Sequence, residues 1–132
     1  MSQYRNELLR NAEKITRLHQ RIKETFPFRG ENNEKLKEWQ EACRTFHQEY
    51  DKLAFPSGLE GAYERILDGD TYAMEAAICF LECRPYFFRS GYMFKDILRI
   101  ANRAPLTPDQ RTRYQKLRTA FEAYKASRTT TE

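Results

Sequence analysis

The sequence predicts an all-α fold of about six helices, in which a long N-terminal antiparallel helical hairpin precedes a compact bundle of helix pairs. Apolar residues recur every three or four positions along most of the chain, which is the spacing of one helix face. Glycine, proline and asparagine fall between these stretches, and no stretch alternates polar and apolar residues as a strand does. The 132 residues, 40% of them hydrophobic, are enough for one ordinary core. We therefore expect a single domain over residues 1–132.

The first 54 residues are predicted to form the hairpin. Between residues 2 and 24 one apolar stripe runs through Tyr4, Leu8, Ile15, Leu18 and Ile22. Pro27 and Gly30 interrupt it, and Asn33 is the predicted N-cap of the next helix. A second stripe then steps by three and four positions through Leu36, Trp39, Cys43, Phe46, Tyr50 and Leu53. Helices of about 33 Å are longer than a small domain needs, so one end of the hairpin is expected to project.

Residues 55–126 are predicted to form the bundle, which begins with a short third helix. Ser57 opens this helix in an S-x-x-E capping box, and Gly69 ends it. Acidic residues recur every four positions along it and share one predicted face. With one acidic neighbour they form a candidate partner-binding stripe: Glu60, Glu64, Asp68 and Asp70. The alternative is an ordinary solvated helix face.

The fourth and fifth helices are expected to form the centre of the bundle. Asp70 or Thr71 caps the fourth helix, which is apolar nearly all round in its second half and therefore predicted to be the most buried. Pro85 ends it. The fifth helix carries a clear apolar face, formed by Met93, Ile97, Leu98, Ile100 and Ala101.

The sixth helix has the clearest start in the chain. Thr107 is its predicted N-cap, Pro108 occupies the first helical position, and Gln110 completes a capping box. Residues 127–132 are expected to be a frayed tail.

Charge is distributed unevenly along the chain. The net charge is only +4, but residues 53–83 hold one basic and six acidic side chains, net −5. Residues 84–118 hold nine basic and two acidic side chains, net +7. An acidic segment is therefore joined directly to a basic one, which favours a binding function over a merely soluble surface.

The basic segment supplies a second set of candidate binding residues. Its cations recur every four positions on the fifth helix, and aromatic residues lie between them, which suits a protein partner or a nucleic acid. The candidates are Arg84, Tyr86, Phe88, Arg89, Lys95, Arg99, Arg103 and Arg111. The alternatives are that these cations are ordinary solvated faces and that most of the rings belong to the core.

No catalytic motif is present in the sequence. It has no phosphate-binding loop and no nucleophile elbow, and it has only one close pair of potential metal ligands, Cys79 and Cys83, where a zinc site normally shows two. His47 and Asp51 lie four residues apart and are expected to be a surface pair, and the three cysteines are expected to be reduced. The sequence thus predicts a protein that is not an enzyme and that needs no cofactor or metal.

A resemblance rests on the stretch AAICFLECRPYFFRSGYMFKDILRIANRAPLTPDQRTRYQKL. An alanine-rich helix, an aromatic corner and a basic helix follow one another there, as in small bacterial proteins built from HEAT or armadillo helix pairs. The resemblance covers about residues 58–125 and implies a binding surface rather than a reaction. Some immunity proteins that neutralise toxins of contact-dependent inhibition systems are small all-α domains of this kind.

These observations lead to one functional hypothesis and two alternatives. The first is a cytoplasmic inhibitor or immunity-type protein that covers the active site of a toxin or enzyme through charge-complementary helices. The second is a nucleic-acid-binding protein that uses residues 84–118. The third is a structural homodimer through the hairpin, so the oligomeric state is left open between monomer and homodimer. The longest apolar run has six residues, Ala76 to Leu81, which predicts no membrane partner.

Overall fold

The computed structural model describes residues 2–130, with side chains for residues 4–128. This part of the chain is all-α and contains no strand, as the sequence predicts. Its six helices are α1 (Ser2–Thr25), α2 (Asn33–Ala54), α3 (Ala62–Leu67), α4 (Thr71–Cys83), α5 (Ser90–Arg103) and α6 (Pro108–Thr130). One short 3₁₀ turn, η1 (Phe26–Phe28), follows α1.

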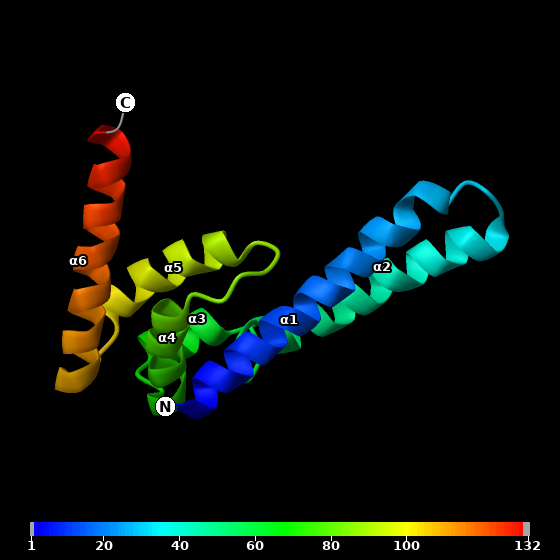
Figure 1. Ribbon diagram of the computed structural model, residues 1–132. Coiled ribbons are helices and arrows are strands. Elements are labelled where there is room, and N and C mark those ends of the chain that lie inside the picture. The colour runs from blue at the N-terminus through cyan, green and yellow to red at the C-terminus, as the bar shows by residue number, and fades with distance from the viewer. Residues whose placement is uncertain (1, 131–132) are drawn as a thin grey trace.

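The predicted N-terminal hairpin is confirmed. Helices α1 and α2 run antiparallel, and their far end stands well away from the other helices (Figure 1). Leu8 and Ile15 are almost fully buried on α1, and Phe46 is buried on α2. The N-cap of α2 is Asn32 rather than the predicted Asn33: its side chain accepts a hydrogen bond from the backbone N–H of Lys35 at 2.8 Å.

The projecting end of the hairpin carries aromatic residues. Phe26 and Phe28 are each about half exposed there, and the Arg29 guanidinium lies 3.6 Å from the centroid of the Phe26 ring. The same guanidinium lies 5.6 Å from the Trp39 ring. The aromatic contacts at the projecting end are therefore made by residues in or near the turn between α1 and α2.

The predicted capping box at Ser57 is wrong. The backbone is left-handed at Ser57, Gly58 and Gly61, with φ of 68°, 93° and 76°, so these residues form a loop and α3 begins only at Ala62. Asp51 holds this loop in place with two hydrogen bonds. Its side-chain Oδ1 accepts the Glu60 N–H at 2.8 Å, and its backbone carbonyl accepts the Leu59 N–H at 2.9 Å. The end of α3 is as predicted, because Gly69 has a φ of 87° and follows the last helical turn.

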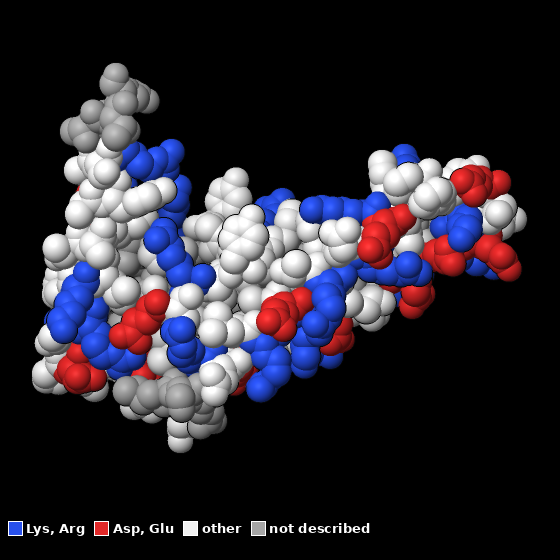
Figure 2. Space-filling view, viewed as in Figure 1, with Lys and Arg blue, Asp and Glu red and all other residues white. Residues whose placement is uncertain are grey.

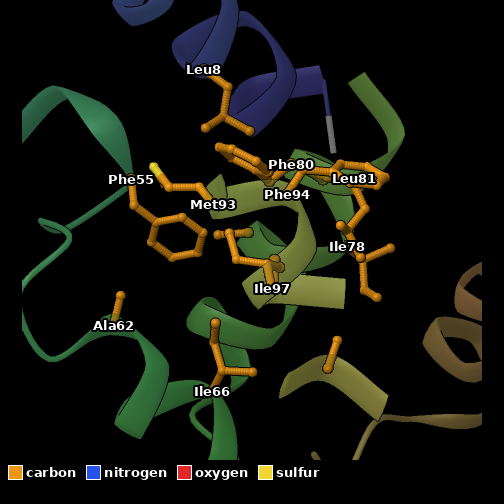
Figure 3. Close-up of a cluster of buried hydrophobic side chains, with 14 of the residues drawn as sticks. Leu8, Phe55, Ala62, Ile66, Ile78, Phe80, Leu81, Met93, Phe94 and Ile97 are labelled. Carbon is orange, nitrogen blue, oxygen red and sulfur yellow. The ribbon is translucent and has the colours of Figure 1, made fainter. Parts of the chain in front are cut away.

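The core lies where α1, α3, α4 and α5 meet. Figure 3 shows Phe80 and Leu81 of α4 beside Met93 and Phe94 of α5. Phe55, Ile66, Ile78, Phe80 and Ile97 are all fully buried. The prediction that the fourth helix is the most buried is confirmed, since α4 is buried at nearly every position from Ala73 to Leu81. Asp70 is its N-cap and accepts the backbone N–H of Ala73 at 2.9 Å.

Helix α6 begins with the predicted capping box. The Thr107 hydroxyl accepts the Gln110 N–H, and the Gln110 side chain accepts the Thr107 N–H, both at 3.1 Å. Tyr114 is fully buried and donates to the carbonyl of Leu98 at 2.7 Å, which ties α6 to α5. The helix continues to Thr130, so the tail predicted for residues 127–132 does not begin at residue 127, and residues 131–132 lie outside the described part of the chain.

A charged network joins α6 to α4. The Arg113 guanidinium contacts the Glu75 carboxylate at 3.1 Å and the Glu82 carboxylate at 2.7 Å, and the Arg113 side chain is only 16% exposed. Burial acts to raise the pKa of Glu75, but hydrogen bonds from Gln110 and Arg113 outweigh it and hold that pKa below its ordinary value. Hydrogen bonds that Arg113 donates to the Glu82 carboxylate raise the pKa of Arg113. Two acids of the acidic segment thus share one cation of the fold, Glu75 at a half-buried position and Glu82 at the surface.

None of the helices within residues 2–130 combines the length and the apolar character needed to cross a membrane.

Candidate binding surface

The basic face of α5 forms as the sequence predicts. Lys95, Arg99 and Arg103 are exposed, while Ile97 and Ala101 on the opposite face are buried. Only Arg99 has an ion pair with the nearest acid, because its guanidinium lies 3.3 Å from the Asp96 carboxylate on the exposed surface. Both groups of this pair face water, so the pair adds little to stability, and three cations against one acid leave the face positive.

A groove of about 660 Å³ separates this face from α6. Seven of its twelve lining residues are cations: Arg84, Lys95, Arg99, Arg103, Arg118, Lys125 and Arg128. The single acid in the lining is Glu122, and the apolar part of the lining includes Leu98 and Phe121. Helix α6 contributes Arg118, Lys125 and Arg128, which were not among the candidate site residues. The seven-residue spacing of the first two was the only sign in the sequence that they share a face.

Aromatic rings hold several of these cations in place. Arg84 lies in a left-handed conformation after α4, and its guanidinium carbon is 4.3 Å from the Phe94 centroid and 6.0 Å from that of Phe121. The Lys125 ammonium is 5.3 Å from the same Phe121 ring, on which it is held by cation–π attraction. Arg118 donates to the Tyr114 hydroxyl at 3.0 Å. The groove therefore presents partly ordered positive charges rather than freely moving ones.

A second hollow, of about 550 Å³, lies between α1 and the start of α5. None of its eleven lining residues is acidic, and three are the cations Lys23, Arg89 and Lys95. Two of its rings are strongly exposed: Tyr86 at 89% and Tyr92 at 70%. The segment from Pro85 to Tyr92 thus presents exposed aromatic side chains beside cations, with no acid in the lining of this hollow.

The neighbouring ring of Phe88 is anchored to the hairpin. It lies 4.5 Å from the His19 ring and 5.8 Å from the Phe46 ring, and its carbonyl accepts the Tyr50 hydroxyl at 2.8 Å. Burial, with a contribution from a neighbouring lysine, lowers the pKa of His19. The expectation that most of these rings belong to the core is wrong. Phe87 and Phe94 are buried, whereas Tyr86, Tyr92 and, at 39%, Phe88 are exposed.

A smaller hollow of about 250 Å³ connects the other two. It shares Arg84 and Phe121 with the groove, shares Tyr86 with the second hollow, and shares Lys95 with both. The three form one continuous surface, which we name the cationic track. Figure 2 shows Lys and Arg side chains along the edge of α6 that faces the hairpin and again along the hairpin, with uncharged side chains between them.

Arg111 and Arg113, both basic residues of the same segment, serve the fold rather than the track. Arg111 donates to the carbonyls of Ala104 at 3.0 Å and Asn102 at 3.3 Å, which satisfies the C-terminal end of α5. Arg113 is engaged by the acids of α4. Arg111 was a candidate binding residue, but it is absent from the lining of the track's three hollows.

The predicted acidic stripe does not form one helix face. Only Glu64 lies within α3, since Glu60 belongs to the preceding loop and Asp68 and Asp70 follow the helix. The Asp70 carboxylate is already used as the N-cap of α4. A helical stripe at a four-residue period needs a helix of at least nine residues, and α3 has six.

The remaining titratable residues form no metal cluster in the described part of the chain. Cys43, Cys79 and Cys83 are free thiols, and burial together with the nearby Glu75 carboxylate raises the pKa of Cys79 to about 11. His47 is exposed, while Asp51 accepts backbone hydrogen bonds from the loop before α3.

Comparison with known proteins adds no relative. The chain matches no family model, no curated protein and no solved structure. The fold and the track therefore define an all-α protein with one extended cationic surface, and the resemblance of residues 58–125 to helical-repeat proteins stays a prediction.

Proposed function

We propose that this protein is a non-enzymatic protein-binding module of the inhibitor or immunity type, which acts in the cytosol by covering the active site of a toxin or enzyme. The observation that supports it is the cationic track, where exposed rings lie beside cations with little acidic charge between them. Tyrosine and arginine are the residues most often responsible for binding energy at protein interfaces. Such a surface suits a partner with an acidic face.

The acidic residues now have a smaller place in this function than the sequence suggested. Glu75 and Glu82 are engaged by Arg113, and the acidic helical stripe that was a candidate partner-binding surface is not formed. Charge complementarity with a partner therefore rests on the track. Electrostatic attraction of this kind mainly raises the association rate and excludes partners of the wrong charge.

Capture of the partner, followed by an assay of its activity, tests this function. The wild-type protein serves as bait in an extract of its native host, and the captured protein is then purified and titrated with the bait. We expect loss of the partner's activity at a one-to-one ratio. Tyr86→Ala is expected to weaken binding about 30-fold, the effect of one interface hot spot. Tyr72→Ala removes a similarly exposed tyrosine outside the track and is expected to bind normally.

Two outcomes contradict the proposed function. Recovery of nucleic acid without any protein partner replaces it with the second candidate. A captured protein that keeps its full activity when saturated removes the inhibitory role.

Nucleic-acid binding is the second candidate because the track is continuous. It passes from α6 to the hairpin with one acidic lining residue, as a path for a phosphate backbone requires. This function predicts that affinity for a single-stranded oligonucleotide falls steeply as salt rises, whereas a flat salt response excludes it.

A further inference from the structure

Past Phe121, helix α6 extends beyond the core of the protein. Leu117 and Phe121 are the last residues of this helix that pack on the core, and residues 122–128 are all exposed. In Figure 1, α5 and α6 diverge from their junction, so the C-terminal end of α6 stands apart from the other helices. The groove thus widens between two helices, with an apolar floor at Leu98 and Phe121.

Both walls of this groove carry cations at helical spacing. On α5, Lys95, Arg99 and Arg103 are four residues apart, which is a rise of about 6 Å per step. On α6, Arg118 and Lys125 are seven residues apart, or about 10 Å. Carboxylates placed every four residues on a bound helix have the same period as the α5 row.

We propose that the groove between α5 and α6 binds an acidic amphipathic helix of the partner protein, an inference that rests on the proposed function. The apolar side of this helix packs on Leu98, Phe121 and the half-exposed Tyr124, and its carboxylates face the cations of both walls. The bound segment occupies the place of a third helix beside α5 and α6. Helix-in-groove binding of this kind combines apolar anchors with flanking charge pairs.

The details of the groove favour a helix over a nucleic acid. The rings of Phe94 and Phe121 already carry the cations of Arg84 and Lys125, whereas stacking of bases needs open ring faces. Glu122 also lies in the lining, 3.4 Å from Arg118 and 3.9 Å from Lys125, where it repels phosphate. A helix can place its own basic or neutral residues against Glu122, but a uniform phosphate backbone cannot.

Three fluorescent probes test this inference at one salt concentration. The first is a helix-forming 18-residue peptide with glutamates every four positions and a leucine stripe beside them. The second peptide has the same composition in scrambled order, and the third probe is an oligothymidylate of equal net charge. By fluorescence anisotropy we expect the ordered peptide to bind at least tenfold more tightly than either control.

Variants of the full chain locate the binding. The double reversal Arg99→Glu with Arg103→Glu is expected to weaken binding of the ordered peptide at least tenfold. Tyr124→Ala is expected to weaken it about threefold, and Tyr124→Phe is expected to retain binding. The matched control is Arg10→Glu with Lys37→Glu, which makes the same charge change at exposed positions of the hairpin. Thermal unfolding followed by circular dichroism verifies that each variant is folded.

The inference is overturned if both peptides bind equally, if the oligothymidylate binds most tightly, or if the Arg99 and Arg103 reversal has no effect. Its failure is separable from failure of the proposed function. A captured partner that binds the wild type and the double reversal equally well removes the groove as the site but leaves the inhibitory function standing. The absence of any inhibited partner removes the function itself.

Discussion

The hairpin and the bundle are stabilised in different ways. In the outer half of the hairpin, α1 and α2 stand away from the bundle, and the ion pairs of α2 join residues three positions apart on the exposed surface, as between Lys35 and Glu38 at 3.4 Å (Figure 1). In the bundle, fully buried side chains come from distant parts of the chain, and Arg113 reaches back 38 residues to Glu75. The outer half of the hairpin is therefore held by packing between two helices that adjoin in the sequence, whereas the bundle joins helices from distant parts of the chain, and its contacts also shape the cationic track.

The largest expected loss of stability comes from replacing isoleucine by alanine, a change that can be made in both the bundle and the hairpin. Ile97→Ala is expected to cost about 4 kcal/mol of unfolding free energy, because Ile97 is fully buried among α3, α4 and α5. Ile22→Ala removes the same atoms from a half-buried site on the hairpin and is expected to cost about 1–2 kcal/mol. Urea denaturation followed by circular dichroism measures both losses.

If Ile97→Ala does not fold, the same comparison of unfolding free energies is made with the milder substitutions Ile97→Val and Ile22→Val. Equal losses at the two positions contradict the difference between hairpin and bundle.

A smaller effect compares charged groups. Arg113→Ala is expected to cost about 2–3 kcal/mol, since it leaves the half-buried Glu75 carboxylate, and the more exposed one of Glu82, without their main partner. Lys52→Ala removes an exposed hairpin cation that lies 3.6 Å from Glu49 and is expected to change stability by less than about 0.5 kcal/mol. A loss below about 0.5 kcal/mol for Arg113→Ala indicates that α6 is held by its apolar contacts alone.

The smallest effect concerns pH. Because the pKa of folded Glu75 is below its ordinary value of 4.5, this residue contributes stability above about pH 4.5 that is lost as pH falls through the lowered pKa. Melting temperatures measured from pH 7 to pH 3 should therefore fall less steeply with acidification for Glu75→Gln than for the wild type. Glu49→Gln in the hairpin is the control, and it should keep the wild-type dependence. If Glu75→Gln also follows the wild-type curve, the ionised Glu75 does not stabilise the fold.

Local signals in the sequence predicted local structure well. The capping box of Thr107 and Gln110 and the cap at Asp70 are confirmed because their hydrogen bonds close within three residues. The same type of signal at Ser57 is wrong because Asp51 binds the loop from the preceding helix. A cap can be predicted from its own sequence only where no distant residue competes for the same backbone groups.

The sequence predicted the part of the candidate surface that lies on a single helix, because that part depends only on local order. The row of Lys95, Arg99 and Arg103 follows from helix periodicity and an apolar opposite face. That this row lies across the groove from Arg118 and Lys125 depends on the direction in which α6 leaves α5. The Tyr114 hydrogen bond and the ion pairs of Arg113 determine this direction. The role of Arg111 was likewise invisible, because its partners are the carbonyl groups at the end of another helix.

The sequence by itself determined an all-α chain, the hairpin, the order of the helices and the segregation of acidic from basic residues, since periodicity and charge are properties of neighbours along the chain. Tertiary structure alone decided which charges remain available for binding. Packing of α6 on α4 neutralises Arg113 against Glu75 and Glu82, while divergence of α6 from α5 opens a groove lined by seven cations. Net charge along a segment does not reveal this outcome, because electrostatic pairing depends on distances in space that only the folded chain fixes.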